Sequence, residues 1–420
     1  MAERPERSLP KQTEEWADLK GAYRLLNNPR VDPAWIGRRH QQLTRQGCAG
    51  QGVVLCVQDD SDLCAAKIDA EQYVMHNTLA VLPSGEVLGL LQQRFFSRVE
   101  QPVGETRQQR AGRWRESDVW QEAVEEIGDS PPEGRFIHVA DRGADNLRFM
   151  HACVNRNVGF VVRAHHDRRI NQATGKLWLH LAAQPIAGVT VGVIGTQRNG
   201  LGRIVRAGRE AKLAVRYATV RLEQPWNGHE QHDGPLTVNA IYLSEIDPPA
   251  GVEPVDWMLL TSEPVTTFEQ ALAIIGYYRC RWVIEEWHRA LKEGCRLERS
   301  QLQDAQALMR LTAVLSVVAI RLIQLRDLAD KPGGDAQTLR QLLPATWILI
   351  VAALARTDPA ALTPQQFWQA IAKRGGWLGR KNDGRPGWKA IWTGWHDVHQ
   401  LVEGAELIAS INKLTLNRCG

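Results

Sequence analysis

The sequence predicts a mixed α/β fold, and three patterns along the chain support this prediction. Up to residue 164, apolar strand-like runs alternate with amphipathic helical stretches, an order typical of a sheet covered by helices. Between residues 165 and 250, short β-like runs follow one another without a helix-period stretch. From residue 335 onward the pattern is helical. We therefore expect a mixed sheet core with an all-β insertion and a helical C-terminal region.

The elements of the first part follow from hydrophobic periodicity and turn residues. Two short helices are expected between residues 13 and 46, divided by Asn27-Asn28-Pro29. Residues 83–86, Pro-Ser-Gly-Glu, predict a hairpin turn. Strands are expected at 53–58, 76–82, 87–92, 136–140 and 159–163, and helices at 117–127 and 144–155.

The second part continues with strands in and after the insertion and then with helices. Strands are expected at 189–194, 212–222, 236–243 and 257–260, and helices at 267–292 and 305–328. The predicted organisation has five segments: an N-terminal arm with short helices (1–50), the core's first part (51–164), the β-rich insertion (165–250), the core's second part (251–334) and a C-terminal helical dimerisation region (335–420).

Composition excludes several classes of protein. With 420 residues, 44% of them hydrophobic, the chain can bury a sizeable core. The charged N-terminus has no secretory signal, and the longest apolar run, 314–325, is broken by Arg321. Seven cysteines without a C-x-x-C pair argue against a disulfide framework and against structural zinc. These features predict a cytoplasmic protein.

A net charge of +4 does not by itself indicate nucleic-acid binding, so the distribution of charge matters more. Residues 196–216 hold six cations against one Glu, which predicts either a DNA path or a solvated β surface. In the helix expected at 267–292, Tyr278, Arg281, Glu285 and Lys292 share one face roughly 21 Å long. A carboxylate flanked by cations suits a polyanion. The alternative is a solvated face with pairs such as Glu285 with Arg289.

Two further carboxylates accompany Glu285. Asp59 and Asp141 each directly follow an apolar strand, where an α/β sheet presents side chains to ligands. Three carboxylates held together need a cation, and all-oxygen ligation suits Mg²⁺ or Mn²⁺. Two such ions can support phosphodiester hydrolysis. The alternatives are turn or capping roles for each Asp, and Asp60 in place of Asp59 as first ligand.

These residues resemble a known family. The spacing Tyr278-x2-Arg281-x3-Glu285-x6-Lys292 resembles the Y-R-E-K signature of bacterial DDE transposases of the cut-and-paste, insertion-sequence-four-like group. Further similar blocks occur in order, so that the resemblance covers roughly residues 15–400; they lie at 21–29, 57–59, 140–145, 160–163, 257–265, 321–326 and 386–395.

The resemblance implies an RNase H-like core interrupted by a β-rich insertion. It implies that Asp59, Asp141 and Glu285 bind two Mg²⁺ ions, for which Mn²⁺ can substitute. It also implies DNA contacts by Tyr278, Arg281, Lys292, Trp257, Arg163 and Arg289. Among these, Trp257 would receive a flipped base; without the resemblance, it would be read as a core aromatic.

The implied function is cut-and-paste transposition: cleavage at the transposon ends, hairpin formation and strand transfer into target DNA. The implied partners are double-stranded DNA, both inverted-repeat ends and target, and a second copy in a synaptic dimer. The expected location is the cytoplasm, at the nucleoid. Only about 20 residues precede the block at 21–29, where family members commonly have a further end-binding segment. A non-enzymatic DNA-binding or dimerising inhibitor, or a nuclease without integration, is therefore the alternative.

Overall fold

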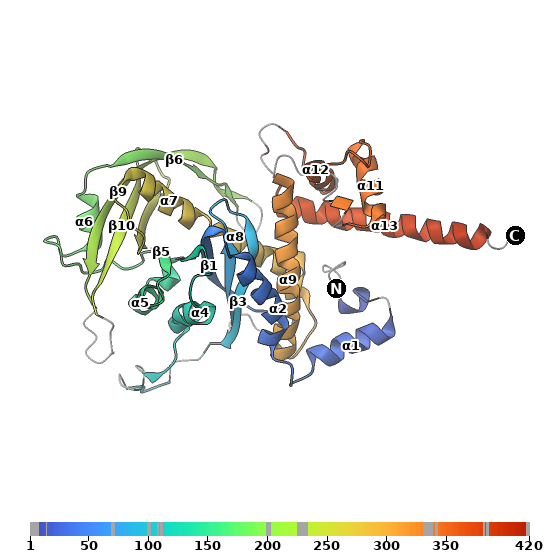
Figure 1. Ribbon diagram of the computed structural model, residues 1–420, viewed down its shortest axis with the longest axis horizontal. Coiled ribbons are helices and arrows are strands. Elements are labelled where there is room, and N and C mark those ends of the chain that lie inside the picture. The colour runs from blue at the N-terminus through green and yellow to red at the C-terminus, as the bar shows by residue number, and fades with distance from the viewer. Residues whose placement is uncertain are drawn as a thin grey trace. The chain divides into compact units, whose positions relative to one another are not determined.

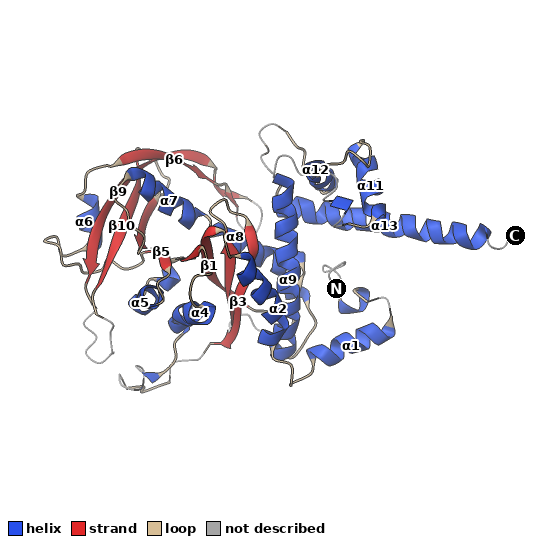
Figure 2. Cartoon of the chain, viewed as in Figure 1, coloured by secondary structure: helices blue, strands red, loops and turns tan. Residues whose placement is uncertain are grey.

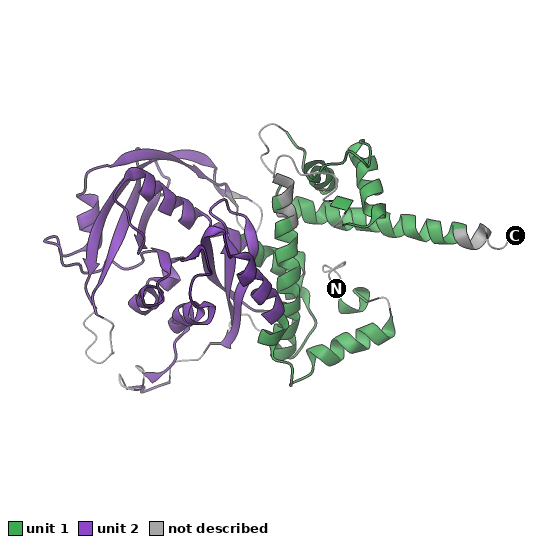
Figure 3. Ribbon diagram, viewed as in Figure 1, with its two compact units in different colours: residues 1–37, 64–70, 286–420 green, residues 38–63, 71–285 purple. Residues whose placement is uncertain are grey.

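The computed structural model describes residues 8–13, 15–68, 72–98, 102–106, 109, 112–198, 203–224, 234–330, 339–340, 343–380, 383 and 386–416. The chain divides into two compact units, drawn in different colours in Figure 3. The sheet unit comprises residues 38–63 and 71–285, and the helical unit comprises residues 1–37, 64–70 and 286–420. Asp59, Asp141 and Glu285 all belong to the sheet unit.

The sheet unit is built on a nine-stranded sheet with the order β3-β2-β1-β4-β5-β11-β10-β9-β6 (Figure 1). β1, β4 and β5 are parallel neighbours, and the other pairs are antiparallel. The mixed α/β sheet is therefore confirmed. The strands are β1 (Gly52–Asp62), β2 (Tyr73–Val81), β3 (Val87–Ser97), β4 (Gly134–Ala140), β5 (Gly159–Arg163), β6 (Gly188–Ile194), β9 (Arg209–Leu222), β10 (Leu236–Glu245) and β11 (Asp256–Thr261).

Helices pack against the sheet (Figure 2). α4 (Val119–Ile127), α5 (Leu147–Asn155) and α6 (Leu177–Ala182) share one hydrophobic core with alternate residues of the central strands. α7 (Phe268–Arg279) packs against β4, β5 and β9. Because side chains alternate along a strand, the buried residues outside that core, such as Val57, Ile137 and Val161, point to the opposite face.

The predicted insertion differs from the expectation in two ways. Its strands β6, β9 and β10 continue the core sheet through β11, and it contains the helix α6, where no helix was predicted. A six-residue helix is too short for its periodicity to be visible in sequence. A separate two-stranded ribbon pairs β7 (Gln197–Arg198) with β8 (Ile204–Arg206).

Two of the basic residues in this region serve the sheet itself. Arg209 forms an ion pair with the buried carboxylate of Glu245, and the guanidinium of Arg216 lies 6.0 Å from the ring centroid of Tyr242. These two arginines have partners within the sheet, and the choice between a DNA path and a solvated surface for residues 196–216 stays a prediction.

The single helix predicted at 267–292 is wrong. α7 ends at Arg279, α8 (Trp282–Arg289) follows, and residues 290–294 form a π-helical turn, η4 (Ala290–Gly294). Around the break, Arg281 N donates to Tyr278 O at 3.0 Å and Val283 N donates to Cys280 O at 3.0 Å. These bonds span three residues instead of four, so the turn is tighter than an α-helix. Hydrophobic periodicity continues through such a change of winding and does not reveal it.

The helical unit contains α1 and the helices after residue 286. They are α1 (Trp16–Leu26), α9 (Ala305–Asp330), α11 (Ala345–Ala355), α12 (Pro364–Arg374) and α13 (Trp388–Leu416), with the 3₁₀ turns η1 (Leu9–Lys11) and η5 (Leu297–Arg299). α2 (Pro33–Gly47) runs from this unit into the sheet unit. The two predicted N-terminal helices are thus present, whereas residues 1–7 of the predicted arm lie outside the described residues.

Part of α9 is apolar enough to span a membrane by length and composition. This stretch, Ala305–Gln324, has a mean hydropathy of 1.7 and is longer than the run recognised in the sequence. About 67% of it is buried in the protein. Arg310 within it donates to the carbonyls of Leu26 and Val31 at 2.9 and 2.6 Å. These are properties of a core helix.

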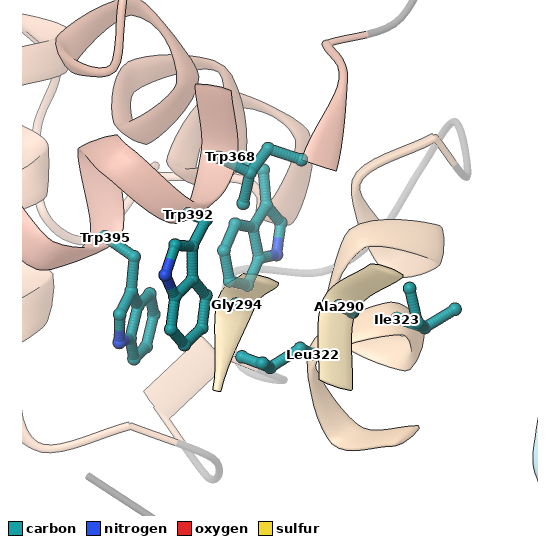
Figure 4. A pocket seen from close by; sticks show the side chains of 8 residues that line it. Ala290, Gly294, Leu322, Ile323, Trp368, Trp392 and Trp395 are labelled. Carbon is teal, nitrogen blue, oxygen red and sulfur yellow. The ribbon is translucent and has the colours of Figure 1, made fainter. Parts of the chain in front are cut away.

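Tryptophans form the centre of the C-terminal helices. Trp395 stacks on Trp347 and on Trp368, with ring centroids 4.2 and 5.5 Å apart. α12 and α13 cross on glycines, since a Cβ on Gly394 would lie 1.7 Å from the carbonyl oxygen of Ile371. Trp368, Trp392 and Trp395 also line an apolar pocket beside Leu322 (Figure 4). These tryptophans therefore pack the C-terminal helices against one another.

Candidate active site

Asp59 lies inside β1, two residues beyond the last parallel pair with β4, Val57 with Val139. The sequence placed it directly after the strand, which is wrong, because β1 continues to Asp62 in antiparallel pairing with β2. Asp59 is nevertheless at the carboxyl end of the parallel part of the sheet. Strand alternation places its side chain on the face of Val57, opposite the α4 and α5 core.

The side chain of Asp60 points to the opposite face of the sheet from that of Asp59. Its Oδ1 lies 2.5 Å from Nδ1 of His76, whose Nε2 lies 3.1 Å from Oε1 of Gln58. Nε2 of Gln58 in turn lies 2.5 Å from Nδ1 of His138. His76, Gln58 and His138 are fully buried, and burial lowers the pKa of His138 to about 3. This chain, Asp60–His76–Gln58–His138, supports Asp59 over Asp60 as the site carboxylate.

Asp141 directly follows β4, as the sequence predicted. It is the N-cap of the 3₁₀ turn η3 (Arg142–Ala144), and its Oδ1 accepts a bond from Gly143 N at 2.7 Å. The capping role that the sequence left as an alternative is therefore present. It uses one carboxylate oxygen and leaves the other for a second partner.

Glu285 and Arg281 come from the broken helix. Arg281 lies in the turn between α7 and α8, and its Nη2 donates to Oε1 of Glu285. Its Nη1 lies 3.6 Å from Oδ2 of Asp59, so that one guanidinium contacts both carboxylates. The side chains of Asp59, Arg281 and Glu285 are 17%, 15% and 30% exposed, which keeps this pairing partly desolvated.

Asp59, Asp141 and Glu285 come from neighbouring elements, because β4 pairs with β1 and Arg281 contacts both Asp59 and Glu285. The pKa of Asp59 is raised to about 7, first by burial, with Arg281 opposing and with repulsion from Asp141, Glu285 and Asp60 adding to the rise. Such repulsion between oxygen donors is what a divalent cation relieves, so the carboxylates fit such an ion in their chemistry. Among the described residues, no three His, Cys, Asp or Glu side chains stand close enough to hold a metal ion as they are.

Tyr278, Arg163 and Trp257 form an aromatic and cationic cluster in the same unit. The rings of Trp257 and Tyr278 meet edge to face at 5.2 Å, and the Arg163 guanidinium lies 5.7 Å from the Trp257 ring. Arg163 also donates to Asp256 O at 3.0 Å. Burial raises the pKa of Tyr278 against the opposing charges of Arg281 and Arg163. These contacts bring together three of the residues that the sequence proposed for DNA binding.

Arg289 and Lys292 belong to the helical unit. Arg289 is exposed at the end of α8, and Lys292 in η4 lies 3.7 Å from Oε1 of Glu298. Tyr278 lies in α7 and Lys292 in η4, so the single helix expected to carry both residues is not formed. Their role at the site stays a prediction.

Sequence reasoning missed two sets of supporting residues. One is the buried chain of Gln58, His76 and His138; polar residues inside apolar strands were its only visible signal. The other is Asp145, whose fully buried carboxylate accepts from Arg168 Nε at 2.9 Å and from the backbone N of His165 and His166 at 2.7 and 2.9 Å. Asp145 thereby ties the loop after Asp141 to the loop after Arg163.

Carboxylates from β1, the end of β4 and α8, with arginine and aromatic side chains beside them, define an enzyme class that acts on phosphodiester bonds of nucleic acid. Comparison with protein families agrees. Residues 1–31 match the Transposase DNA-binding family, residues 110–318 the Transposase DDE domain, and residues 344–414 the Transposase Tn5 dimerisation domain. The chain belongs to the DDE transposases of the Tn5 type.

Family membership confirms several predictions. The protein is a DDE transposase with an RNase H-like core; it binds DNA and forms a homodimer. The family depends on divalent metal ions. The DDE match includes Asp141 and Glu285 and begins after Asp59. The DNA-binding match at 1–31 includes the roughly 20 residues that precede the block at 21–29. A family DNA-binding segment is therefore present there.

Proposed function

We propose that this transposase cuts the ends of its element by Mg²⁺-dependent hydrolysis and moves the element by a cut-and-paste route. Asp59, Asp141 and Glu285 are the ligands of two Mg²⁺ ions, and Mn²⁺ can replace them. The observation that carries this proposal is geometric: Asp59 and Glu285 share the guanidinium of Arg281, and Asp141 follows β4, the parallel neighbour of β1.

The bound ions supply activation of the attacking oxygen and stabilisation of the leaving oxygen. The attacking oxygen comes first from water and then from the freed 3′-OH, so no protein nucleophile is needed. Attack of the 3′-OH on the opposite strand closes a hairpin, a second water reopens it, and the 3′-OH then joins target DNA. In each step the attacking oxygen forms one P–O bond, the P–O bond to a 3′ oxygen breaks, and that oxygen leaves as a free 3′-OH.

The protein's own side chains hold the DNA in this proposal. Arg281 and Arg163 bind phosphate oxygens, since guanidinium groups pair with phosphate through two parallel bonds. Tyr278 donates its hydroxyl to the same backbone. Trp257, partly exposed and supported by Tyr278 and Arg163, offers a ring on which a flipped base can stack. Arg289 and Lys292 extend the phosphate contacts. The partners are inverted-repeat ends and target DNA in a synaptic dimer, in the bacterial cytoplasm at the nucleoid.

End cleavage with a labelled inverted-repeat duplex and Mg²⁺ tests this function. We expect Glu285→Gln to lower the cleavage rate by roughly a thousandfold or more, equivalent to ~4 kcal/mol of transition-state stabilisation. Glu269→Gln, an exposed carboxylate on the first turn of α7, is the matched control and retains the wild-type rate. Chelation of the metal abolishes cutting by both proteins.

The products distinguish the proposal from its alternatives. Hairpins and joined target products support cut-and-paste transposition. Cutting without hairpins or joining indicates a nuclease, and binding of the ends without cutting indicates an inhibitor. Cutting that survives Glu285→Gln, or that proceeds with chelated metal, contradicts the triad.

A further inference from the structure

Arg281 occupies the position between two of the proposed metal ligands. Its Nη2 bonds Glu285, four residues along the chain, and its Nη1 lies 3.6 Å from Oδ2 of Asp59. The break between α7 and α8 places Arg281 in a turn. The planar fork of a guanidinium, unlike a lysine ammonium, can donate to two separate carboxylates at once.

A divalent ion bound by Asp59 and Glu285 would stand beside the guanidinium that contacts both carboxylates, and the two positive charges repel. A divalent ion requires carboxylate oxygens at about 2.0–2.2 Å. In the described part of the chain, no three acidic, His or Cys side chains are gathered closely enough for this. In this structure, the cation that contacts both Asp59 and Glu285 is the guanidinium of Arg281.

We propose that Arg281 is an internal counter-cation that a metal ion displaces, and that the displaced guanidinium then binds a phosphate of the DNA end. This inference rests on the proposed function, because it takes Asp59 and Glu285 as metal ligands and DNA as substrate. The metal ion binds the carboxylates and the DNA phosphate binds the guanidinium, so the two ligands do not compete. Each of them breaks the ion pairs of Arg281 with Asp59 and Glu285 and so frees the group that the other ligand binds.

Two physical consequences follow. First, removal of Arg281 would leave Asp59 and Glu285 without the guanidinium that both contact, so that a metal ion would meet no competing cation there. Second, coupling between two ligands is reciprocal, so that DNA tightens metal binding by the factor by which metal tightens DNA binding. Such coupling reserves the loaded site for the bound end and limits cutting elsewhere.

The test measures Mn²⁺ binding to the full chain by equilibrium dialysis, with and without an end duplex that is already cleaved, so that no turnover is needed. For wild type, we expect the duplex to tighten Mn²⁺ binding by roughly 5-fold to 100-fold, the usual range of such coupling. Arg281→Gln binds Mn²⁺ more tightly than wild type without DNA, and its coupling factor falls close to one.

Two further variants complete the design. Arg281→Lys keeps the charge and the fold but cannot bridge two carboxylates, so we expect intermediate values. Arg156→Gln, which removes an exposed pair with Glu125 on α4, behaves as wild type. Circular dichroism verifies that each variant is folded.

Specific results overturn the inference. Mn²⁺ binding that is equal or weaker in both Arg281→Gln and Arg281→Lys shows that Arg281 supports the ligands instead of competing with the ion. An unchanged coupling factor in these variants has the same meaning. Failure of the proposed function is a separate result: Glu285→Gln then binds Mn²⁺ as wild type does, whatever the Arg281 variants show.

Discussion

The negative charge of the Asp59 carboxylate is unfavourable in the folded protein. Burial and the neighbouring carboxylates raise its pKa to about 7 from a usual value of 3.8, although Arg281 opposes the rise. The folded protein therefore binds a proton at Asp59 between about pH 4 and pH 7, where the unfolded chain does not. Over that window, Asp59 lowers the stability of the metal-free protein as pH rises.

Asp59→Asn removes this cost. We expect the variant to be more stable than wild type at pH 8 by an amount of the order of a few kcal/mol, because a pKa shift of one unit corresponds to about 1.4 kcal/mol. The gain shrinks as pH falls from 7 toward 4. Urea denaturation in the presence of a chelator measures it. Asp62→Asn, exposed at the end of the same strand, is the control, and an equal gain for Asp59→Asn at pH 5 and pH 8 contradicts the account.

Single residues of the site differ in how far sequence could predict them. The places of Asp141 and Glu285 in the fold were predictable, because Asp141 follows a strand and Glu285 lies on a helix, while their role as metal ligands stays a prediction. The position of Arg281 between two carboxylates was not predictable, because side-chain pairing depends on a helix break that apolar periodicity does not record.

At the scale of elements, β1 positions the site through both of its faces. Gln58 and Asp60 face α4 and α5, where His76 meets Trp120 edge to face at 4.8 Å. Asp59, between them in sequence, faces the other way. A slip of one residue in this strand would exchange the two faces, so the buried polar chain fixes which carboxylate enters the site.

Gln58→Leu tests that role. The substitution leaves Nε2 of His76 and Nδ1 of His138 without their partner in a fully buried position. We expect a loss of about 1–3 kcal/mol of unfolding free energy for each buried group left unsatisfied. Chemical denaturation measures it, with Gln51→Leu, exposed directly before β1, as control. An unfolding free energy unchanged from wild type would show that the contacts among Asp60, His76, Gln58 and His138 do not stabilise β1.

Elements were predicted well where one pattern dominates and poorly where winding changes. β5 was placed at its observed bounds, and the two N-terminal helices on either side of Asn27 to Pro29 were recognised. The helix from 267 to 292 was predicted as one because Ala271, Ile274 and Ile275 set a period that continues past residue 280. The tight turn and the π-helical turn change the winding of the backbone without interrupting the apolar period, so the sequence does not display them.

At the scale of the whole molecule, the two units contain different functional parts of a transposase. The sheet unit contains the carboxylates, and the helical unit contains the matches to the DNA-binding and dimerisation families. The last turns of α13 within the dimerisation match expose apolar side chains; these are Leu407, Ile408 and Ile411, each at least half exposed. Exposed apolar clusters of this kind indicate an interface.

Leu407→Asp combined with Ile411→Asp should weaken the homodimer, because burying two carboxylates in an apolar contact is costly. We expect the dissociation constant to rise by about a hundredfold or more, equivalent to ~3 kcal/mol. Sedimentation velocity over a range of protein concentrations measures it. Asn412→Asp adds charge on the same helix and serves as control. A dimer as strong in the double variant as in the control places the interface elsewhere.

The central claim is that Asp59, Asp141 and Glu285 bind the catalytic metal, and a change of metal preference tests it most directly. We replace Asp141 by Cys and measure end cleavage in Mg²⁺ and in Mn²⁺. A thiolate is a poor ligand for Mg²⁺ and a better one for a softer ion. We predict that Asp141→Cys is inactive in Mg²⁺ and regains cleavage in Mn²⁺, whereas Asp141→Ala is inactive in both. Full activity of Asp141→Cys in Mg²⁺, or equal recovery of Asp141→Ala in Mn²⁺, would contradict the account.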